Sequence, residues 1–156
     1  MIRFLADVMC AFVGTVTFST LFNVPKRYYL SCGLVGTFGF VVYEIVAMYA
    51  SAPISAFCGA LFVVFASRML TVRMKCPITM FLIPGIFPLI PGARVYFTVY
   101  YMVTEQLNLS VQAGMDAVKI AFGIVIGMVV VVSIPRQVFQ PIYWKERKAR
   151  KAVKHF

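Results

Sequence analysis

Long apolar stretches separated by short polar breaks run through most of the chain. A membrane-spanning helix needs about 20 mostly apolar residues. Five stretches approach this length, and they cover residues 4–22, 28–50, 54–72, 78–103 and 111–134. The fourth differs from the others because proline and glycine interrupt it repeatedly. The pattern therefore predicts an all-α integral membrane protein with about five transmembrane helices, the fourth of them broken.

The polar breaks between these stretches are short and carry turn residues. Pro53 suits the first turn of the third helix, and Ser110 is expected to cap the fifth. Pro135 and Arg136 end the last apolar stretch. We therefore divide the chain into a five-span membrane domain at 1–136 and a basic tail at 137–156.

Composition supports a membrane protein. The chain is 62% apolar and 13% charged, whereas soluble domains are about 45–50% apolar and about 25% charged. A soluble chain of 156 residues could not bury so much apolar surface, so a soluble enzyme and a disordered chain are both excluded.

The net charge of +10 depends strongly on the tail, because six of the fifteen lysines and arginines lie in the last twelve residues. No soluble domain presents this charge, so nucleic-acid binding is not expected. The tail is expected to fix orientation and to contact anionic membrane lipids.

Basic residues also predict the orientation of the spans. With five spans, Lys26, Arg27, Arg73, Lys75 and the tail share one side, and Lys and Arg favour the cytoplasmic side. The N-terminus is then outside, together with the short loop at Ser51 and the loop at Glu105, and the C-terminus is cytoplasmic. A cleaved secretory signal is the alternative for the first span, but Asp7 interrupts it and no Ala-x-Ala-like site follows.

No motif for metal binding or catalysis stands out. The four cysteines, Cys10, Cys32, Cys58 and Cys76, are widely spaced and accompany a single histidine. Neither a Ser/His/Asp set nor a phosphate-binding GxxxxGK[ST] loop is present. We therefore expect no metal, no cofactor and no enzyme activity, and we interpret the cysteines as packing residues.

Small residues recur at helical spacing on three of the spans. The sets are Gly33, Gly36 and Gly39; Ala52, Ala56 and Ala60; and Gly123 with Gly127. Small residues let helix backbones approach closely in lipid. The pattern fits helix packing inside the chain, with a subunit contact as the alternative.

The fourth stretch carries the most informative pattern. Pro84, Pro88 and Pro91 each lack a backbone donor, and Gly85 and Gly92 follow two of them. A continuous helix is therefore not expected, and a second half-helix should start near Pro91-Gly92. Irregular backbone at membrane depth must be buried in protein or line a wet cavity. Broken spans build substrate sites in many transporters, although a helix kinked only for packing is the alternative.

Charged residues inside the apolar stretches are candidates for function. Arg94 lies well inside the fourth, and we expect it to pair with Glu44 or to bind a substrate carboxylate, with a snorkelling side chain as the simpler alternative. Arg68 and Lys119 are expected to snorkel from positions near their span ends. Asp116 and Lys119, three residues apart, are expected to pair with each other.

Several short motifs along the chain resemble those of a known family. Phe22-Asn23-Val24-Pro25, then Gly36, then Pro84-Gly85-x-x-Pro88-Leu89-Ile90-Pro91-Gly92-x-x-x-Tyr96, is similar to the threonine/serine exporter family. The similarity is to the C-terminal half of its fused members, or to the separately encoded small subunit, and it covers nearly the whole chain except the tail. Positions 93 and 94 are usually small in this family, whereas this chain has Arg94.

The resemblance implies a subunit of an ion-gradient-driven exporter in the bacterial inner membrane. Its substrates would be threonine and serine, or dicarboxylates such as succinate, and its partner a larger subunit similar to the family's N-terminal half, or further copies of itself. The candidate substrate-binding residues are Asn23, Gly85, Pro88, Pro91, Gly92, Arg94 and Tyr96, with Glu44 as the candidate for ion coupling. The alternative function is a membrane scaffold that transports nothing.

Overall fold

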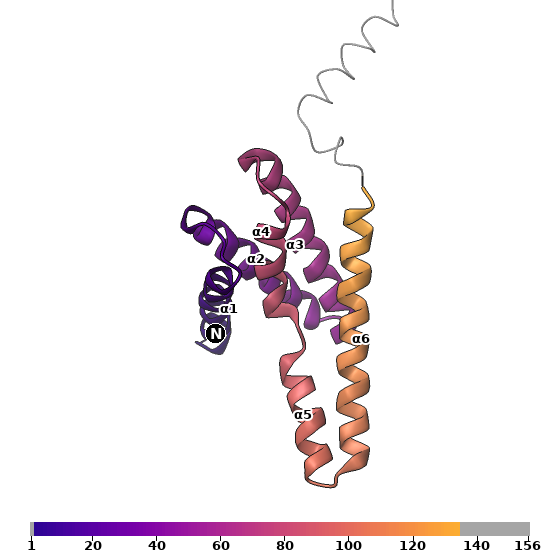
Figure 1. Ribbon diagram of the computed structural model, residues 1–156. Coiled ribbons are helices and arrows are strands. Elements are labelled where there is room, and N and C mark those ends of the chain that lie inside the picture. Colours follow the sequence, from indigo (N-terminus) through magenta and orange to yellow (C-terminus); the bar gives the residue numbers. More distant parts are fainter. Residues whose placement is uncertain (1, 135–156) are drawn as a thin grey trace, which may run out of the picture.

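The computed structural model describes residues 2–134, which form an assembly of helices (Figure 1). Six α-helices and two short 3-10 helices follow one another as α1 (Ile2–Leu21), η1 (Lys26–Tyr28), α2 (Tyr29–Ala47), α3 (Ala52–Met74), α4 (Thr79–Ile86), η2 (Phe87–Leu89), α5 (Gly92–Val103) and α6 (Leu107–Val132). The predicted tail at 137–156 lies outside the described residues.

Four of these helices are long and apolar enough to cross a membrane: Phe4–Leu21, Lys26–Ala47, Ala52–Met74 and Leu107–Val132. The pair Thr79–Leu89 and Gly92–Val103 passes the same criteria together and is bent by 48°, so it supplies a fifth, broken span. The predicted all-α, multi-pass membrane protein is therefore confirmed. Pro53 lies in the first turn of α3, as expected.

The core lies where α2, α3, α4 and the C-terminal half of α6 meet. The largest helix interface joins α3 to α6, and α2 packs against α1, α3 and α4. Buried residues from four elements form the main apolar cluster, which contains Val35, Ala56, Ala60, Val63, Leu89, Ile120 and Ile124. The small residues lie on these interfaces, which supports the prediction of packing inside the chain.

A close approach of backbones explains the two glycines of α6. A Cβ atom added at Gly127 would lie 2.6 Å from the Phe57 carbonyl oxygen of α3, and one at Gly123 would clash with the Pro53 carbonyl oxygen. Real side chains do not tolerate such contacts with backbone, so glycine is what lets α3 lie directly against α6.

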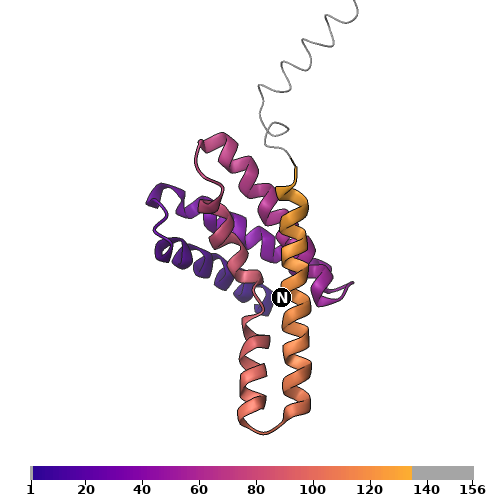
Figure 2. The ribbon, with the colours of Figure 1, turned by 45° about the vertical axis from the view of Figure 1, so that its right-hand side comes forward.

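The basic loops lie at one end of the molecule. Val24 and Tyr28, beside the α1–α2 connection, pack with Phe81, and Cys76 of the α3–α4 loop packs against the same cluster. The end of α6 joins this end of the molecule (Figures 1 and 2). The structure thus places the loops with Lys26 and Lys75 on one side, as the charge pattern predicted.

Arg68 does not snorkel, contrary to the sequence-based expectation. Its side chain is 8% exposed, and it donates hydrogen bonds to the Val132 carbonyl oxygen at 2.7 Å and to the Ile134 carbonyl oxygen. The last carbonyls of a helix have no partner within the helix and carry partial negative charge. A guanidinium from α3 therefore caps the C-terminus of α6.

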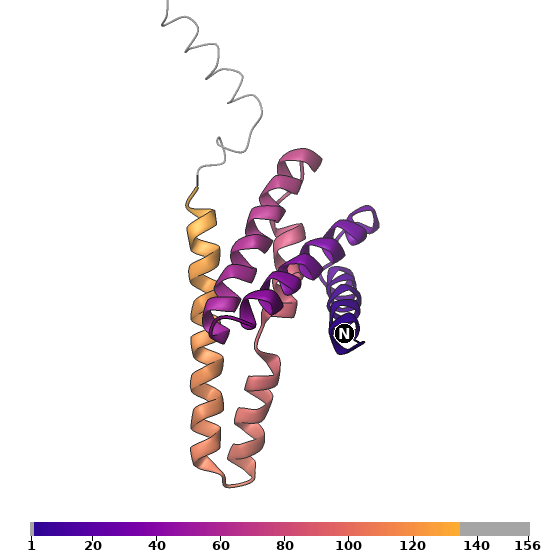
Figure 3. The same cartoon turned by 180° about the vertical axis from the view of Figure 1, so that it is seen from behind.

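The opposite end of the molecule is uneven. The α2–α3 turn at 48–51 ends beside the middle of α6, while α5 and the first half of α6 continue beyond it as a two-helix arm (Figure 3). α5 packs on α6 and contains no buried residue. The Ser51 and Glu105 loops therefore lie at different heights along α6 (Figure 3). α6 itself starts at Leu107, earlier than the predicted residue 111.

Ser110 does not cap α6, because it lies in the helix rather than before it. Its hydroxyl instead donates a hydrogen bond of 2.8 Å to the Thr98 carbonyl oxygen of α5. This side chain therefore holds the two helices of the arm together.

Candidate functional site

The fourth span is broken at Ile90 and Pro91, next to the predicted start of the second half-helix, whereas Pro84, contrary to our expectation, does not interrupt its helix. Pro84 lies inside α4, Pro88 in η2 and Pro91 immediately before α5. α5 begins at Gly92, the position expected for the second half-helix. Proline cannot donate a backbone hydrogen bond, and its ring disfavours helix in the residue before it. The sequence therefore fixes both the break and the starting point of α5.

The first turn of α5 leaves two backbone donors open. The Gly92 amide donates to the Ile90 carbonyl oxygen at 2.7 Å, and the Val95 amide donates to the Pro91 carbonyl oxygen at 3.1 Å. The amides of Ala93 and Arg94 have no acceptor among the described residues. Open amides at a helix N-terminus favour an anionic group, because the helix dipole is positive there.

The two halves of the broken span have different surroundings. In the first half, Phe81, Pro84, Gly85 and Leu89 are buried, and Phe87 stacks on Phe18 of α1. Gly85 faces the side chains of Val35 and Val63, so it belongs to the core. The second half is exposed on the arm. The break therefore marks the boundary between the packed body and the arm.

Arg94 faces a polar cleft at this boundary. Its Nη1 atom lies 3.6 Å from Oδ2 of Asp116 on α6, and Asp116 Oδ1 lies 3.9 Å from the Lys119 ammonium. The cleft has a volume of about 350 Å³ and is lined by Ser51, Ala52, Pro53, Arg94, Asp116, Lys119 and Ile120. The N-terminus of α3, the start of α5 and the middle of α6 thus meet around three charged side chains.

The expected pairing of Asp116 with Lys119 is confirmed, but the expected pairing of Arg94 with Glu44 is wrong. Arg94 pairs with Asp116 because α5 packs on α6 and not on α2. Glu44 is partly buried near the end of α2. Glu44 is not among the residues that line the cleft.

Two further candidate residues lie away from the cleft lining. Tyr96 is 63% exposed on α5 and stacks on Tyr100 with ring centroids 6.2 Å apart. Asn23 is exposed in the loop after α1, with a left-handed φ of 54°. The Phe22 ring beside it lies 6.4 Å from the Phe87 ring of η2, on the packed half of the broken span.

Sequence reasoning did not assign Asp116, Lys119 and Ser51 to this site. The sequence does contain a signal for Asp116 and Lys119, since these two opposite charges lie in the most hydrophobic of the spans. Lys119 lies twelve residues into α6, about 18 Å from its start, so it does not sit near a span end as we expected.

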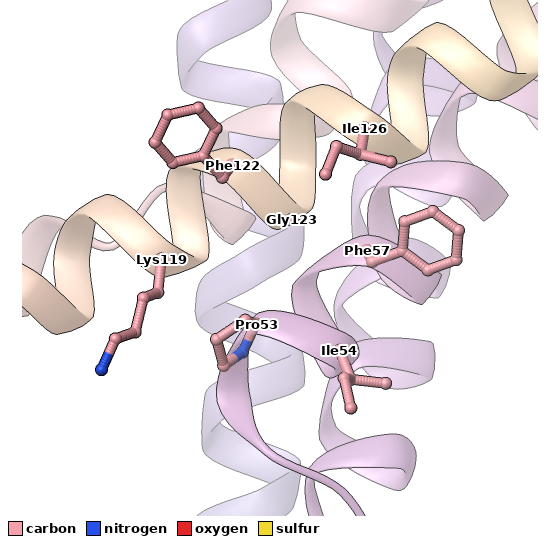
Figure 4. Close-up of a pocket in the computed structure, with 7 residues that line it drawn as sticks. All are labelled: Pro53, Ile54, Phe57, Lys119, Phe122, Gly123 and Ile126. Atoms are coloured by element: carbon pink, nitrogen blue, oxygen red, sulfur yellow. The ribbon is translucent and has the colours of Figure 1, made fainter.

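An apolar groove adjoins the polar cleft between α3 and α6 (Figure 4). Its volume is about 390 Å³, and Pro53, Ile54, Phe57, Lys119, Phe122, Gly123 and Ile126 line it. Pro53 and Lys119 belong to both linings. Lys119 therefore carries its charge at the boundary between an apolar surface and a polar cleft.

Comparison with known proteins shows the family of the chain. The family model described as "Threonine/Serine exporter, ThrE" matches residues 7–134, which include most of the first candidate span, all of the others and the broken span. No curated protein and no solved structure matches the chain. Because the match covers most of the sequence, the chain belongs to the threonine/serine exporter family, a family of membrane transporters.

Proposed function

We propose that this chain is a subunit of a secondary-active exporter of small carboxylate-bearing solutes, with threonine and serine as the first candidates. Family membership supports the solute class. The broken span supports a binding site, since it brings the start of α5 and Arg94 to a cleft beside the middle of α6. Dicarboxylates such as succinate are the second candidate substrates.

The solute carboxylate would bind to the Arg94 guanidinium, close to the open amides of Ala93 and Arg94. Such groups recognise carboxylates through charge-assisted hydrogen bonds. Glu44 is our candidate for proton coupling, because it is a partly buried carboxyl in an apolar span. We also propose that the chain lies in the bacterial inner membrane with its basic end in the cytoplasm.

The exposed arm supports the proposal of a partner subunit. α5 buries none of its residues, and its outward side chains include Val95, Tyr96, Val99, Met102 and Val103. A transport pathway enclosed on all sides needs a wall beside this helix. A larger subunit of the same family, or a further copy of this chain, would provide it.

Export by living cells tests the function. In cells that lack this gene, restoring the full chain should restore export of labelled threonine and serine, whereas Arg94→Ala should reduce it about tenfold or more because a charged partner of the carboxylate is lost. The measurement is the initial rate of efflux from preloaded cells, with Arg73→Ala, an exposed basic residue at the end of α3, as the control.

A wild-type chain that restores no export of threonine, serine or succinate would instead favour the scaffold function. Normal export by Arg94→Ala would remove this arginine from the site while leaving the transport function in place.

A further inference from the structure

We propose that Arg94, Asp116 and Lys119 together bind a zwitterionic amino acid, with Arg94 and Lys119 on its carboxylate and Asp116 on its ammonium group. This inference rests on the proposed export function. It goes further by assigning Asp116 and Lys119 to the site and by selecting amino acids over dicarboxylates.

The geometry leaves each of the three charged groups able to accept another partner. The Arg94–Asp116 and Lys119–Asp116 distances are 3.6 and 3.9 Å, longer than the roughly 2.7–2.9 Å of a charge-assisted hydrogen bond. The side chains are 54%, 47% and 58% exposed, in the order Arg94, Asp116 and Lys119. A ligand entering the cleft can therefore reach all three groups without unpacking the core.

The position of these charges within a long apolar helix argues against a purely structural pair. Asp116 lies nine residues after Leu107 in the 26-residue α6, about 14 Å along the helix axis. Charged side chains within a membrane-spanning segment are costly and usually face a cavity or a substrate path. These three face a cleft of about 350 Å³, within the usual size range of small-molecule sites, about 300–1,000 Å³.

The signs of the charges select the ligand. The cleft holds two cations and one carboxylate, so a zwitterion gives every charged group an opposite partner. A dicarboxylate would bring its second negative charge next to Asp116, and like charges in a weakly solvated site repel each other. A ligand without charge could accept or donate hydrogen bonds here but would form none of the three ion pairs.

Ser51 adds a neutral polar group to the cleft lining. It precedes α3, but its hydroxyl does not cap the helix, so this hydroxyl is available to a ligand. A hydroxyl on the ligand side chain, as in threonine or serine, is a suitable partner because a hydroxyl both donates and accepts hydrogen bonds.

Competition in native membrane vesicles tests the site on the unaltered protein. Inside-out vesicles that contain the full chain would be given labelled L-threonine, with L-serine, N-acetyl-L-threonine, L-threonine methyl ester or succinate as competitor. We expect serine to compete well, and the other three to need about tenfold higher concentrations or more, because each lacks one required charge or adds a repelled one. Equal competition by N-acetyl-L-threonine or succinate would overturn the inference.

Asp116→Asn provides the matching variant. It should raise the half-saturating threonine concentration about tenfold or more and remove the discrimination against N-acetyl-L-threonine, since the ammonium group would have lost its partner. A purely structural role for Asp116 would not change which competitor is preferred. Glu105→Gln makes the same chemical change at the tip of the arm, outside the cleft lining, and should behave as the wild type.

The possible failures separate the two proposals. An unchanged half-saturating concentration and unchanged competitor preference in Asp116→Asn would overturn the site alone. Absence of threonine and serine uptake by wild-type vesicles would overturn the export function, and the site with it.

Discussion

Replacing Gly127 by alanine should destabilise the protein by about 1–3 kcal/mol, and replacing it by leucine should cost more, because no side chain fits between α3 and α6 at this point. The added Cβ atom would meet the Phe57 carbonyl oxygen at 2.6 Å and the Leu61 amide nitrogen at 3.3 Å. Both are backbone atoms of a regular helix, so they cannot turn aside. The largest helix interface of the molecule would have to open.

The measurement is the unfolding free energy of the detergent-solubilised full chain, followed by helix content against denaturant. Gly14→Ala is the matched control, because a Cβ atom at Gly14 meets nothing within 4 Å. That substitution should be neutral or stabilise α1 by up to about 1 kcal/mol, since alanine favours helix over glycine. Equal effects at the two positions would contradict the packing described for α6.

Replacing Arg68 by methionine should lower the unfolding free energy by about 2–4 kcal/mol, because the last carbonyls of α6 would lose their donors. The guanidinium bonds to Val132 and Ile134 at once, which a single ammonium group cannot do in the same fork geometry. Arg68→Lys should therefore recover only part of the loss, through its charge at the negative end of the helix.

Unfolding experiments and hydrogen exchange in the last turn of α6 check this prediction. Arg73→Met is the control. It removes a basic residue from the exposed last turn of α3, the helix that also carries Arg68, and it should change the unfolding free energy by less than about 0.5 kcal/mol. An Arg68→Met protein as stable as the wild type, with unchanged exchange at the end of α6, would show that the cap contributes little.

The spans and the break were predictable because both depend on local properties of the chain. Hydrophobic length defines a span, and Pro84, Pro88 and Pro91 remove donors wherever they occur. The start of α5 at Gly92 followed directly from this chemistry. The close packing of Gly123 and Gly127 inside the chain was also foreseen as one of two uses of small residues.

The partners of the charged residues were not predictable in the same way. In an apolar span every face is hydrophobic, so the sequence carries little information about which helix faces which. Glu44 was the expected partner of Arg94, but α5 turns away from α2 at the 48° bend and packs on α6. The partners of Arg68 were unpredictable for the same reason, because its acceptors lie more than 60 residues away, at the end of α6 and just beyond it.

Whether a water-soluble reagent reaches the cleft, and whether the solute blocks it, is the sharpest test of the proposed site. In a chain whose native cysteines have been replaced, Ser51→Cys would place one thiol in the cleft lining, and Glu105→Cys would place one at the tip of the arm. A water-soluble, membrane-impermeant thiol reagent would then be applied to native vesicles with and without L-threonine. If the cleft binds the solute, L-threonine should slow labelling at position 51 but not at position 105. A thiol at position 51 that never reacts, or that reacts equally fast with L-threonine present, would contradict the claim that this cleft binds the exported solute.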